Sequence, residues 1–455
     1  PTPGGANAEP AALGAKTSLV LNEWMAAPRD GADWFELYNP LSLPVDLSSV
    51  SLSDDPSVIG VARFLPSPLS FIDAGGFVKW VADGQPGDGR NHVNFALDGQ
   101  GDYLLVYAYQ GGSFSLVDSV ALGAQTEGVS VGDLPDGSGV EVAFPGSASP
   151  GAGNYRLLTD VVIHEILTHT DPPFEDAIEL HNLTESAIDV GGWYLSNRAD
   201  DLTRFQLPAG LVVPAGDYAV IYEYQFNAGG TNAYAFNSAH GDEIWLSKAP
   251  GGVATGDRVS AEVGAALNGI SFGRVVTSDS VDYAALVQPT FGITNPTDLT
   301  HFRSGTGAAN ALPLVGPVVI SEMLYHPPDG TEEFLELHNG SGSPVPLYDP
   351  AHPSNTWSLG GGIEFALPPG ITLPAGAYLL VVDFDPALDP SALASFRSRY
   401  AIDLSVPVLG PFSGKLDNGG EAVELLRPDA PQTSGPDAGY VPQVIADRVD
   451  YDEVA

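Results

Sequence analysis

The sequence predicts an all-β protein with three tandem copies of one β-sandwich and a short helical insertion in the third copy. Apolar stretches of roughly four to eight residues recur about every ten residues, with Gly, Pro, Asn and Asp between them, as in the antiparallel strands of a sandwich. A set of longer motifs also recurs three times at nearly equal spacing, and such repetition indicates tandem structural units. Together the two observations predict tandem β-sandwiches.

The first two strands of each copy carry the most regular motif. Each copy opens with an apolar strand that ends in Glu, and its second strand places Glu between hydrophobic residues and closes with Asn. Because the hydrophobic residues alternate with Glu, the pattern predicts half-buried antiparallel sheets with the Glu side chains on the opposite face. The nine repeat positions are Glu23, Glu36, Asn39, Glu165, Glu179, Asn182, Glu322, Glu336 and Asn339.

The remaining strands follow in the same order in each copy. A region with the sequence VDLSSVSLSD in copy one and IDVGGWYLSN in copy two comes next, whereas copy three departs from it at VPLYDPAHPSNTWSL. A turn of the form DAGGF, PAGDY or PAGAY then leads into a strand, and a Gly-acidic hairpin leads into GDYLLV, GDEIWL or GEAVELL. A last recurring strand starts at Asp118, Asp257 and Asp447.

One helix is predicted, and it lies in the third copy. Asp389 suits the N-cap and Pro390 the first helical position, while Leu393, Phe396 and Tyr400 form an apolar stripe. The segment is therefore expected to be a helical insertion into a sandwich.

The closing phrase G-x-x-N sets the expected domain boundaries. It occurs in SPGAGN at 149–154 and in PTFGITN at 289–295, and again in PTPGGAN at the start of the chain. The start is therefore expected to be the tail of an earlier copy, and the few residues after Asp447 predict a third copy that is incomplete at its C-terminus. The predicted organisation is a tail and linker (1–15), a first sandwich (16–155), a second (158–296), a linker (297–316) and a third sandwich (317–455).

The composition excludes several classes of site and partner. The chain has 455 residues, with 17 Lys and Arg against 57 Asp and Glu, and its formal net charge is −40. So few cations cannot build many patches for nucleic acid or anionic lipid, and neither is expected as a partner. The absence of Cys excludes disulfides, thiolate nucleophiles and Cys-type metal sites. No apolar run is long enough to predict a transmembrane segment, so membrane insertion is not expected.

Taken together, these motifs resemble the lamin tail domain. The resemblance is carried by the opening strand ending in Glu, the F/I/L-E-L-x-N strand, V-D-L-S…L-S-D, the turn P-A-G-x-Y and the closing P-G-x-x-N, and it covers nearly the whole chain. It implies immunoglobulin-like β-sandwiches in a modular bacterial protein that is secreted or displayed at the cell surface. It implies no catalytic residues, and a fold alone does not give a function.

Two motifs are candidate active sites. The repeated Glu pairs could bind a metal or perform acid–base catalysis. Their recurrence in every copy favours a structural role, in which they accept backbone N–H bonds and fix strand ends or turns. The sequence HEILTH (164–169) is close to a zinc-protease motif, but its His residues are five apart on a predicted strand instead of four apart on a helix, so zinc is not expected.

Acidic loops are the better metal candidates, because Ca2+ takes oxygen ligands from such loops. None has the D-x-D-x-D-G spacing of a calcium loop, and Asp also forms turns through its own backbone, so both roles stay open. The calcium candidates are Asp54, Asp55, Asp133, Asp136, Asp383 and Asp385, and further acidic loops contain Asp83, Asp88, Asp200, Asp201 and Asp389.

The leading functional hypothesis is a non-catalytic, extracellular structural or adhesive array at the bacterial cell surface, as part of a filamentous assembly. Its partners would be other protein subunits or further repeats of the same polypeptide, contacted through edge strands and loop tips. The alternative is an accessory region of a larger secreted hydrolase that binds polysaccharide or protein. Aromatic residues such as Trp24, Trp193 and Tyr38 would then stack on sugars, although most are expected to fill the cores. Catalysis by the Glu pairs is the third hypothesis.

Overall fold

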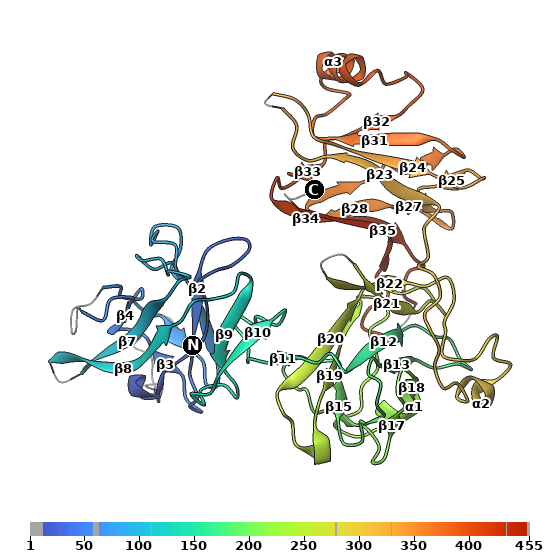
Figure 1. Ribbon diagram of the computed structural model, residues 1–455. Coiled ribbons are helices and arrows are strands. Elements are labelled where there is room, and N and C mark those ends of the chain that lie inside the picture. Colours follow the sequence, from blue (N-terminus) through green and yellow to red (C-terminus); the bar gives the residue numbers. More distant parts are fainter. Residues whose placement is uncertain are drawn as a thin grey trace, which may run out of the picture. The chain divides into compact units, whose positions relative to one another are not determined.

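The computed structural model describes residues 12–57, 63–110, 112–277, 280–328, 330–433 and 435–452. As predicted, the chain is all-β and consists of tandem immunoglobulin-like sandwiches (Figure 1). It divides into two compact units, one formed by Pro1–Thr159 with Ser247–Val259 and the other by Asp160–Leu246 with Ser260–Ala455. The first sandwich belongs to the first unit, whereas the second and third belong almost entirely to the second unit.

The first sandwich pairs a five-stranded sheet, in the order β10-β9-β1-β2-β6, with a three-stranded sheet, β4-β7-β8, and a small β3-β5 pair. Side chains of both larger sheets meet in one core, which includes Leu21, Phe35, Leu52 and Val106. The strands are β1 (Val20–Met25), β2 (Trp34–Tyr38), β3 (Val45–Asp46), β4 (Val50–Ser53), β5 (Phe71–Ile72), β6 (Phe77–Val81), β7 (Asp102–Gln110), β8 (Ser113–Leu122), β9 (Val129–Asp133) and β10 (Glu141–Pro145), and the short 3-10 helix Lys16–Ser18 precedes them.

The second sandwich repeats this plan with a five-stranded sheet in the order β18-β13-β12-β21-β22. Its second sheet has the order β11-β20-β19-β15-β16, and β14 pairs with β17. The strands are β11 (Arg156–Leu157), β12 (Val161–Leu167), β13 (Ala177–Asn182), β14 (Ile188–Asp189), β15 (Tyr194–Ser196), β16 (Phe205–Gln206), β17 (Val212–Val213), β18 (Tyr218–Tyr222), β19 (Asp242–Ser247), β20 (Asp257–Val263), β21 (Phe272–Val276) and β22 (Val281–Ala285), with a 3-10 turn at Pro250–Gly252.

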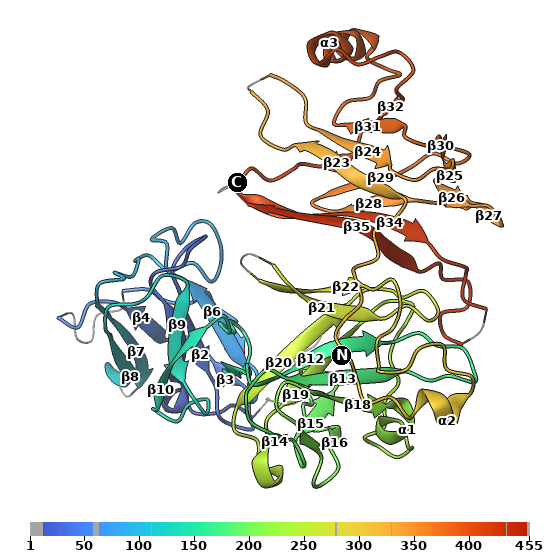
Figure 2. The same cartoon turned by 45° about the vertical axis from the view of Figure 1, so that its right-hand side comes forward.

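The third sandwich has a four-stranded sheet, β23-β24-β31-β32, and a five-stranded sheet, β33-β29-β28-β34-β35 (Figure 2). Two short pairs, β25-β30 and β26-β27, complete it. The strands are β23 (Val318–Leu324), β24 (Phe334–Asn339), β25 (Val345–Pro346), β26 (Tyr348–Asp349), β27 (His352–Thr356), β28 (Ser358–Gly361), β29 (Ile363–Ala366), β30 (Thr372–Leu373), β31 (Tyr378–Val382), β32 (Val408–Leu409), β33 (Ser413–Gly414), β34 (Gly420–Pro428) and β35 (Gln443–Asp452).

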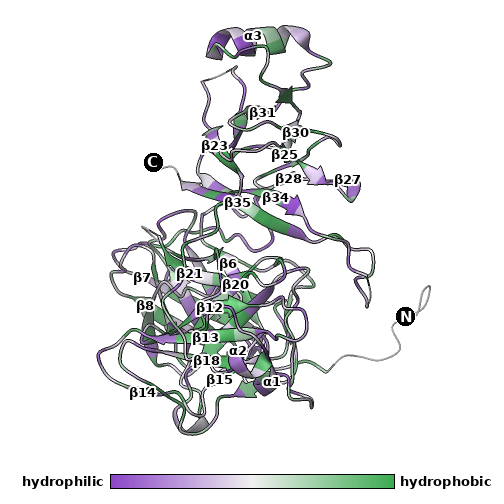
Figure 3. Cartoon of the chain, turned by 90° about the vertical axis from the view of Figure 1, so that its right-hand side faces the viewer, coloured by the Kyte–Doolittle hydropathy of each residue, from purple (hydrophilic) through white to green (hydrophobic). Residues whose placement is uncertain are grey.

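The predicted helix is confirmed as α3 (Pro390–Tyr400), and its Asp389 cap accepts a hydrogen bond from the Ala392 amide at 2.9 Å. Phe396 is fully buried against Phe334 and Val382, so the helix is held by one apolar side while its other side faces solvent. Figure 3 shows this as a mixture of hydrophobic and hydrophilic colours along α3, in contrast to the hydrophobic stretches of β12 and β35.

Two short helices were not predicted, α1 (Glu223–Phe226) and α2 (Leu299–Phe302). Within the described part of the chain, none of the helices has the length and apolar character needed to span a membrane. Helix α2 lies in residues 297–316, the expected linker, and its Phe302 packs in a small aromatic core with Tyr222 and Phe291 of the second sandwich.

Candidate functional site

The paired glutamates lie opposite each other on adjacent strands in all three sandwiches. The register joins Glu23 to Glu36, Glu165 to Glu179 and Glu322 to Glu336. Each first strand contains a β-bulge immediately before its glutamate, so one extra residue is inserted there. The side chain of the inserted residue contacts the second glutamate of the pair each time: Asn22 Nδ2 donates to Glu36 Oε1 at 3.1 Å, His164 Nδ1 lies 2.8 Å from Glu179 Oε1, and Ser321 Oγ donates to Glu336 Oε1 at 2.9 Å.

The first pair is fully buried and surrounded by donors from distant parts of the chain. Glu23 accepts hydrogen bonds from Ser130 Oγ at 2.6 Å and from the amide of Ser149 at 3.1 Å. Glu36 accepts from the amide of Gly151 and from Asn22. Both glutamates have no exposed surface, because residues 147–154 fold over them. The predicted half-buried sheet is therefore wrong in one respect: the glutamates lie on the opposite face as expected, but the closing segment of the sandwich covers that face as well.

The second pair is buried in the same manner. Glu165 accepts from Ser271 Oγ at 2.6 Å and from the amide of Thr290 at 2.8 Å, and Glu179 accepts from the amide of Ala308 at 3.2 Å. Again neither glutamate has exposed surface. The covering donors come from residues 290–308, so the same correction applies to this sheet.

The third pair has the same strand register but a different environment. Glu322 is exposed and Glu336 is partly exposed. Strand β23 lies at the edge of its sheet, and among the described residues only β24 pairs with it. The third sandwich thus keeps the bulge and the pairing while its glutamates face solvent.

Burial shifts the pKa values of the covered carboxyls upwards, because removal from water disfavours the charged form. It raises the pKa of Glu23 to about 7 and those of Glu36 and Glu179 to about 8, and the pKa of Glu165 also rises. The hydrogen bonds that these carboxyls accept act in the opposite direction but are outweighed. Burial lowers the pKa of His164 to about 4, so the buried contact between His164 and Glu179 joins two groups that both favour their neutral forms.

A Ser-x-Gly motif, which the sequence analysis missed, covers each buried pair. In β9 it is Ser130-Val131-Gly132, and at the start of β21 it is Ser271-Phe272-Gly273, with Ser271 immediately before the strand. The glycine lies directly opposite the first glutamate in both cases. The motif could have been found by aligning copies one and two, because in each copy it follows the last predicted strand and precedes a hairpin.

In both sandwiches an asparagine side chain fixes the segment that covers the glutamates. In the second sandwich this asparagine is not the one that the G-x-x-N phrase predicted. Asn154 Nδ2 donates to the carbonyls of Asn22 and Asp133, both at 2.9 Å. In the second sandwich the equivalent bonds are made by Asn310, which donates to the carbonyls of His164 and Arg274. The expected residue, Asn295, is not the equivalent, because an insertion containing α2 separates Thr290 from the true G-x-x-N sequence at 307–310.

The repeated asparagines at the end of the second strand form identical clamps in all three sandwiches. Each is fully buried, and its Nδ2 donates to three backbone carbonyls of the following turn and of the segment before the PAG-type turn. Its Oδ1 accepts from the amide two residues later. The clamps are Asn39, Asn182 and Asn339, and each holds the turn after its strand against the segment that leads into the PAG-type turn.

The HEILTH segment lies in strand β12 and the residues after it, not on a helix. His164 contacts Glu179, whereas His169 Nδ1 lies 2.6 Å from the carbonyl oxygen of Ala266. The two imidazoles therefore serve separate contacts and do not form a zinc-protease pair.

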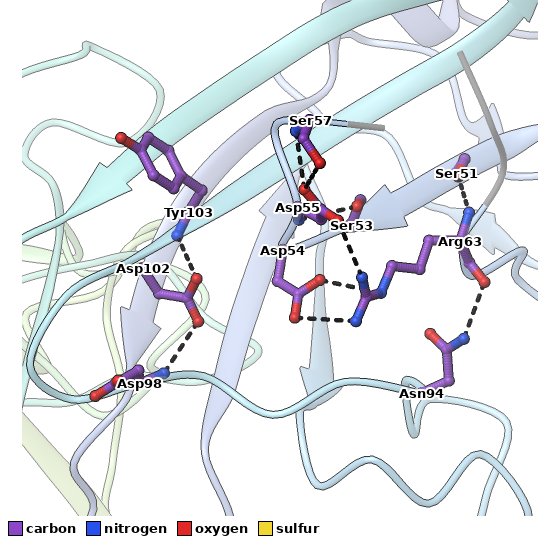
Figure 4. Close-up of polar contacts among 10 residues, drawn as sticks. All are labelled: Ser51, Ser53, Asp54, Asp55, Ser57, Arg63, Asn94, Asp98, Asp102 and Tyr103. Carbon is purple, nitrogen blue, oxygen red and sulfur yellow. Dashed lines mark hydrogen bonds and ion pairs between the residues drawn. The ribbon is translucent and has the colours of Figure 1, made fainter. Parts of the chain in front are cut away.

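The acidic pair Asp54 and Asp55 lies beside a cation that the chain itself supplies. Arg63 Nε is 3.1 Å from Asp54 Oδ1, and Arg63 Nη1 is 3.6 Å from Asp55 Oδ2 (Figure 4). Asp55 Oδ1 also accepts from the amide of Ser57 at 2.8 Å, which is a turn-forming contact. The guanidinium takes the position between the two carboxylates that a metal ion would need.

The other calcium candidates accept backbone amides. These contacts are Gly139 to Asp133, Asn154 to Asp136, Glu333 to Asp383 and Ala387 to Asp385, at 2.8–3.3 Å. In the described part of the chain, no group of three or more His, Asp or Glu side chains has a geometry that could hold a metal ion. Calcium binding stays a prediction.

Most of the aromatic residues considered for sugar stacking are buried. Trp24, Trp34, Trp193 and Trp357 are at most 5 % exposed, and Trp245 and Tyr38 are partly buried. These tryptophans fill the sandwich cores and offer no flat surface to a sugar.

Sandwich architecture, shared bulges and shared asparagine clamps define the class of this protein as a tandem immunoglobulin-like β-sandwich protein. Within it, residues 158–262, which form most of the second sandwich, match the family described as the lamin tail domain. A search among curated proteins gave no match. A search among solved structures gave none either.

Proposed function

We propose that this chain is a non-catalytic structural array of three lamin-tail-type sandwiches, which acts outside the bacterial cell as part of a surface or filamentous assembly. The carrying observation is that the repeated glutamate pair, in two of its three copies, accepts hydrogen bonds from the protein's own backbone and hydroxyl groups. A carboxylate that is fully buried under its own chain has no access to a substrate.

Two further features support this proposal. The same bulge, strand register and asparagine clamp occur in all three sandwiches, so the first and third are assigned to the same family as the matched second. The net charge of −40 keeps such arrays soluble and disfavours partners with phosphate backbones. Protein subunits are therefore the partners that we propose.

The sign of a stability change tests the structural role of the glutamates. Residues kept for catalysis usually cost stability, so their replacement stabilises a fold. If the role is structural, Glu23→Ala and Glu165→Ala each leave buried donors without partners and destabilise their own sandwich by about 2–4 kcal/mol. Glu322→Ala is the matched control, and little change is expected because Glu322 already faces solvent.

Hydrogen exchange followed by mass spectrometry gives the readout, because it reports on each sandwich separately within the whole chain. A gain in protection after Glu23→Ala or Glu165→Ala would overturn the structural assignment. Labelling of intact cells with an antibody against the chain tests the location, and labelling only after the cells are opened would contradict it.

A further inference from the structure

A small cavity lies between the second and third sandwiches, and all the residues that line it belong to the second compact unit. One wall comes from the β21–β22 hairpin and residues 314–317, and the other comes from strands β34 and β35. The volume of the cavity is about 180 Å³. An engineered cavity of about 150 Å³ lined by apolar side chains binds benzene, so this one has room for a single ring or a short alkyl chain.

The two walls are held together by direct contacts. The rings of His240 and Tyr440 stack with their centroids 4.1 Å apart, and His240 Nε2 lies 3.2 Å from Asp437 Oδ1. The cavity is also reached from solvent, because two of its lining residues, Leu314 and Val315, are 39 % and 73 % exposed. Exposed apolar residues at the rim of an apolar cavity are typical of a ligand-binding site.

The cavity is apolar apart from one side chain. Phe272, Val444 and Ile445 are among the lining residues, and of the described residues in this lining Arg427 alone has a polar side chain. Arg427 is partly buried, and burial lowers its pKa. Asp429 attracts it electrostatically, but within the described residues Arg427 forms neither an ion pair nor a side-chain hydrogen bond.

A partly buried arginine without an ion pair is unexpected in so acidic a chain. Asp and Glu number 57 against 17 Lys and Arg, so acidic partners are plentiful. A guanidinium that loses water and gains no anion is unfavourable, and Arg427 is therefore available to an anion from outside the chain. By contrast, carboxylates pair with Arg63, Arg156, Arg198, Arg303, Arg399 and Arg448.

We propose that this cavity binds a small ligand that consists of one apolar group and a carboxylate. The apolar group occupies the space beside Phe272 and Ile445, and the carboxylate pairs with Arg427, whose planar guanidinium can donate two parallel hydrogen bonds to it. Two sources supply this chemistry, a free acid with one ring or a short chain and the C-terminal residue of a peptide. The site is separate from the glutamate pairs and does not depend on the proposed structural function.

The binding test uses the full chain and two probes that share a phenyl ring and a carboxylate. The probe 3-phenylpropionate represents a free acid, and N-acetyl-Gly-Phe represents the end of a peptide. Isothermal titration calorimetry is expected to show saturable binding of at least one probe, and the tighter probe identifies the source. Their uncharged counterparts, 3-phenylpropanol and N-acetyl-Gly-Phe-amide, should bind at least about tenfold more weakly, because they lack the charge that Arg427 recognises.

A substitution in the protein tests the role of the guanidinium. Arg427→Gln removes the charge but keeps a polar side chain, so it should weaken binding of the tighter probe at least about tenfold and leave its uncharged counterpart unaffected. Arg90→Gln is the matched control, because Arg90 is exposed and does not line the cavity. Hydrogen exchange locates the ligand: the probe should slow exchange of residues 444–446 in the unchanged chain and not in Arg427→Gln.

Three results would overturn the proposed binding site. They are an absence of saturable binding for both probes, equal affinity for the charged probes and their uncharged counterparts, and an affinity for the tighter probe that Arg427→Gln leaves unchanged. None of these bears on the stability test of Glu23 and Glu165, so the structural function and the binding site can fail independently.

Discussion

The first and third sandwiches carry the same pair of glutamates on the same two strands, yet the pair is buried in one and open to solvent in the other. The strand register, the bulge and the asparagine clamp are alike in both. The difference lies in donors that come from far along the chain: Ser130 and Ser149 reach Glu23 across 107 and 126 residues. The comparison separates features that a strand pair makes locally from features that depend on a distant segment.

The presence or absence of these distant donors explains why the glutamates contribute differently to stability in different copies. In the first sandwich a carboxyl without exposed surface must be hydrogen-bonded, because a buried polar group without a partner is costly. In the third sandwich Glu322 is exposed and Glu336 partly exposed, so burial imposes no such requirement. The same residue type is therefore a fixed part of the interior in one copy and an available acceptor in another.

The largest expected effect concerns the asparagine clamps, which the first and third sandwiches share. Asn39→Ala, Asn182→Ala and Asn339→Ala each leave buried carbonyls without a donor, and each is expected to destabilise its own sandwich by about 2–4 kcal/mol. The three values should be similar, because no clamp uses the distant segment. Hydrogen exchange of the strands in each sandwich measures the change.

Asn94→Ala is the control for this prediction, since Asn94 is exposed and its side chain donates to the carbonyl of Arg63 at the protein surface. A much smaller effect for Asn339→Ala than for the other two clamps would break the comparison, because it would mean that the third sandwich is not held together as the others are.

The next largest effect is expected at the glycine that lies opposite the first glutamate, Gly132 in the first sandwich and Gly273 in the second. A Cβ on Gly132 would meet backbone atoms of β1, whereas a Cβ on Gly273 would meet the side chains of Asn310 and Leu286, which can shift. Gly132→Ala and Gly273→Ala are expected to cost about 1–3 kcal/mol, with the larger loss at Gly132.

Protection of β1 and β12 against hydrogen exchange measures these losses. Gly87→Ala provides the control, because no atom lies within 4 Å of the added Cβ and its backbone needs no left-handed conformation. Equal and negligible effects at Gly87 and Gly132 would show that β9 does not approach β1 as closely as described.

Local features of the fold could be predicted from the sequence, and distant ones could not. The helix at 390–400 follows from its Asp389 cap and apolar stripe, both of which are short-range signals. The asparagine clamps could be predicted only in part: the recurring Asn marks the end of the second strand, but each Nδ2 donates to one carbonyl four residues later and to two carbonyls 31–35 residues later.

The covered face escaped prediction because period-two alternation reports only one side of a sheet. Glu36 alternates with Phe35 and Leu37 as a solvent-facing residue does, but the side chain has no exposed surface. Likewise Asn295 satisfied the closing phrase, while the insertion with α2 moved its role to Asn310. Only the three-dimensional path of the closing segment distinguishes these alternatives.

The smallest expected effect is the loss of stability when the Ser130 hydroxyl is removed, and the size of this loss depends on pH. Burial raises the pKa of Glu23 from 4.5 to about 7, and the bond from Ser130 opposes that rise. Since the folded protein holds this proton more tightly than the unfolded chain, the stability that it contributes is fully present below about pH 4.5 and is lost as the pH rises towards 7. Ser130→Ala removes a donor that favours the charged form, so the pKa of Glu23 should rise further and the loss should extend to higher pH.

We therefore expect Ser130→Ala to cost about 1 kcal/mol at a pH near 9 and less at a pH near 5, as measured by hydrogen exchange of β1 at both values. A 13C NMR titration of the glutamate carboxyl carbons checks the direction of the pKa change. Ser321→Ala is the comparison variant in the third sandwich: Ser321 takes the bulge position of Asn22, and its hydroxyl donates to the partly exposed Glu336. If Ser321→Ala shows the same pH-dependent loss as Ser130→Ala, burial is not what distinguishes the two sandwiches.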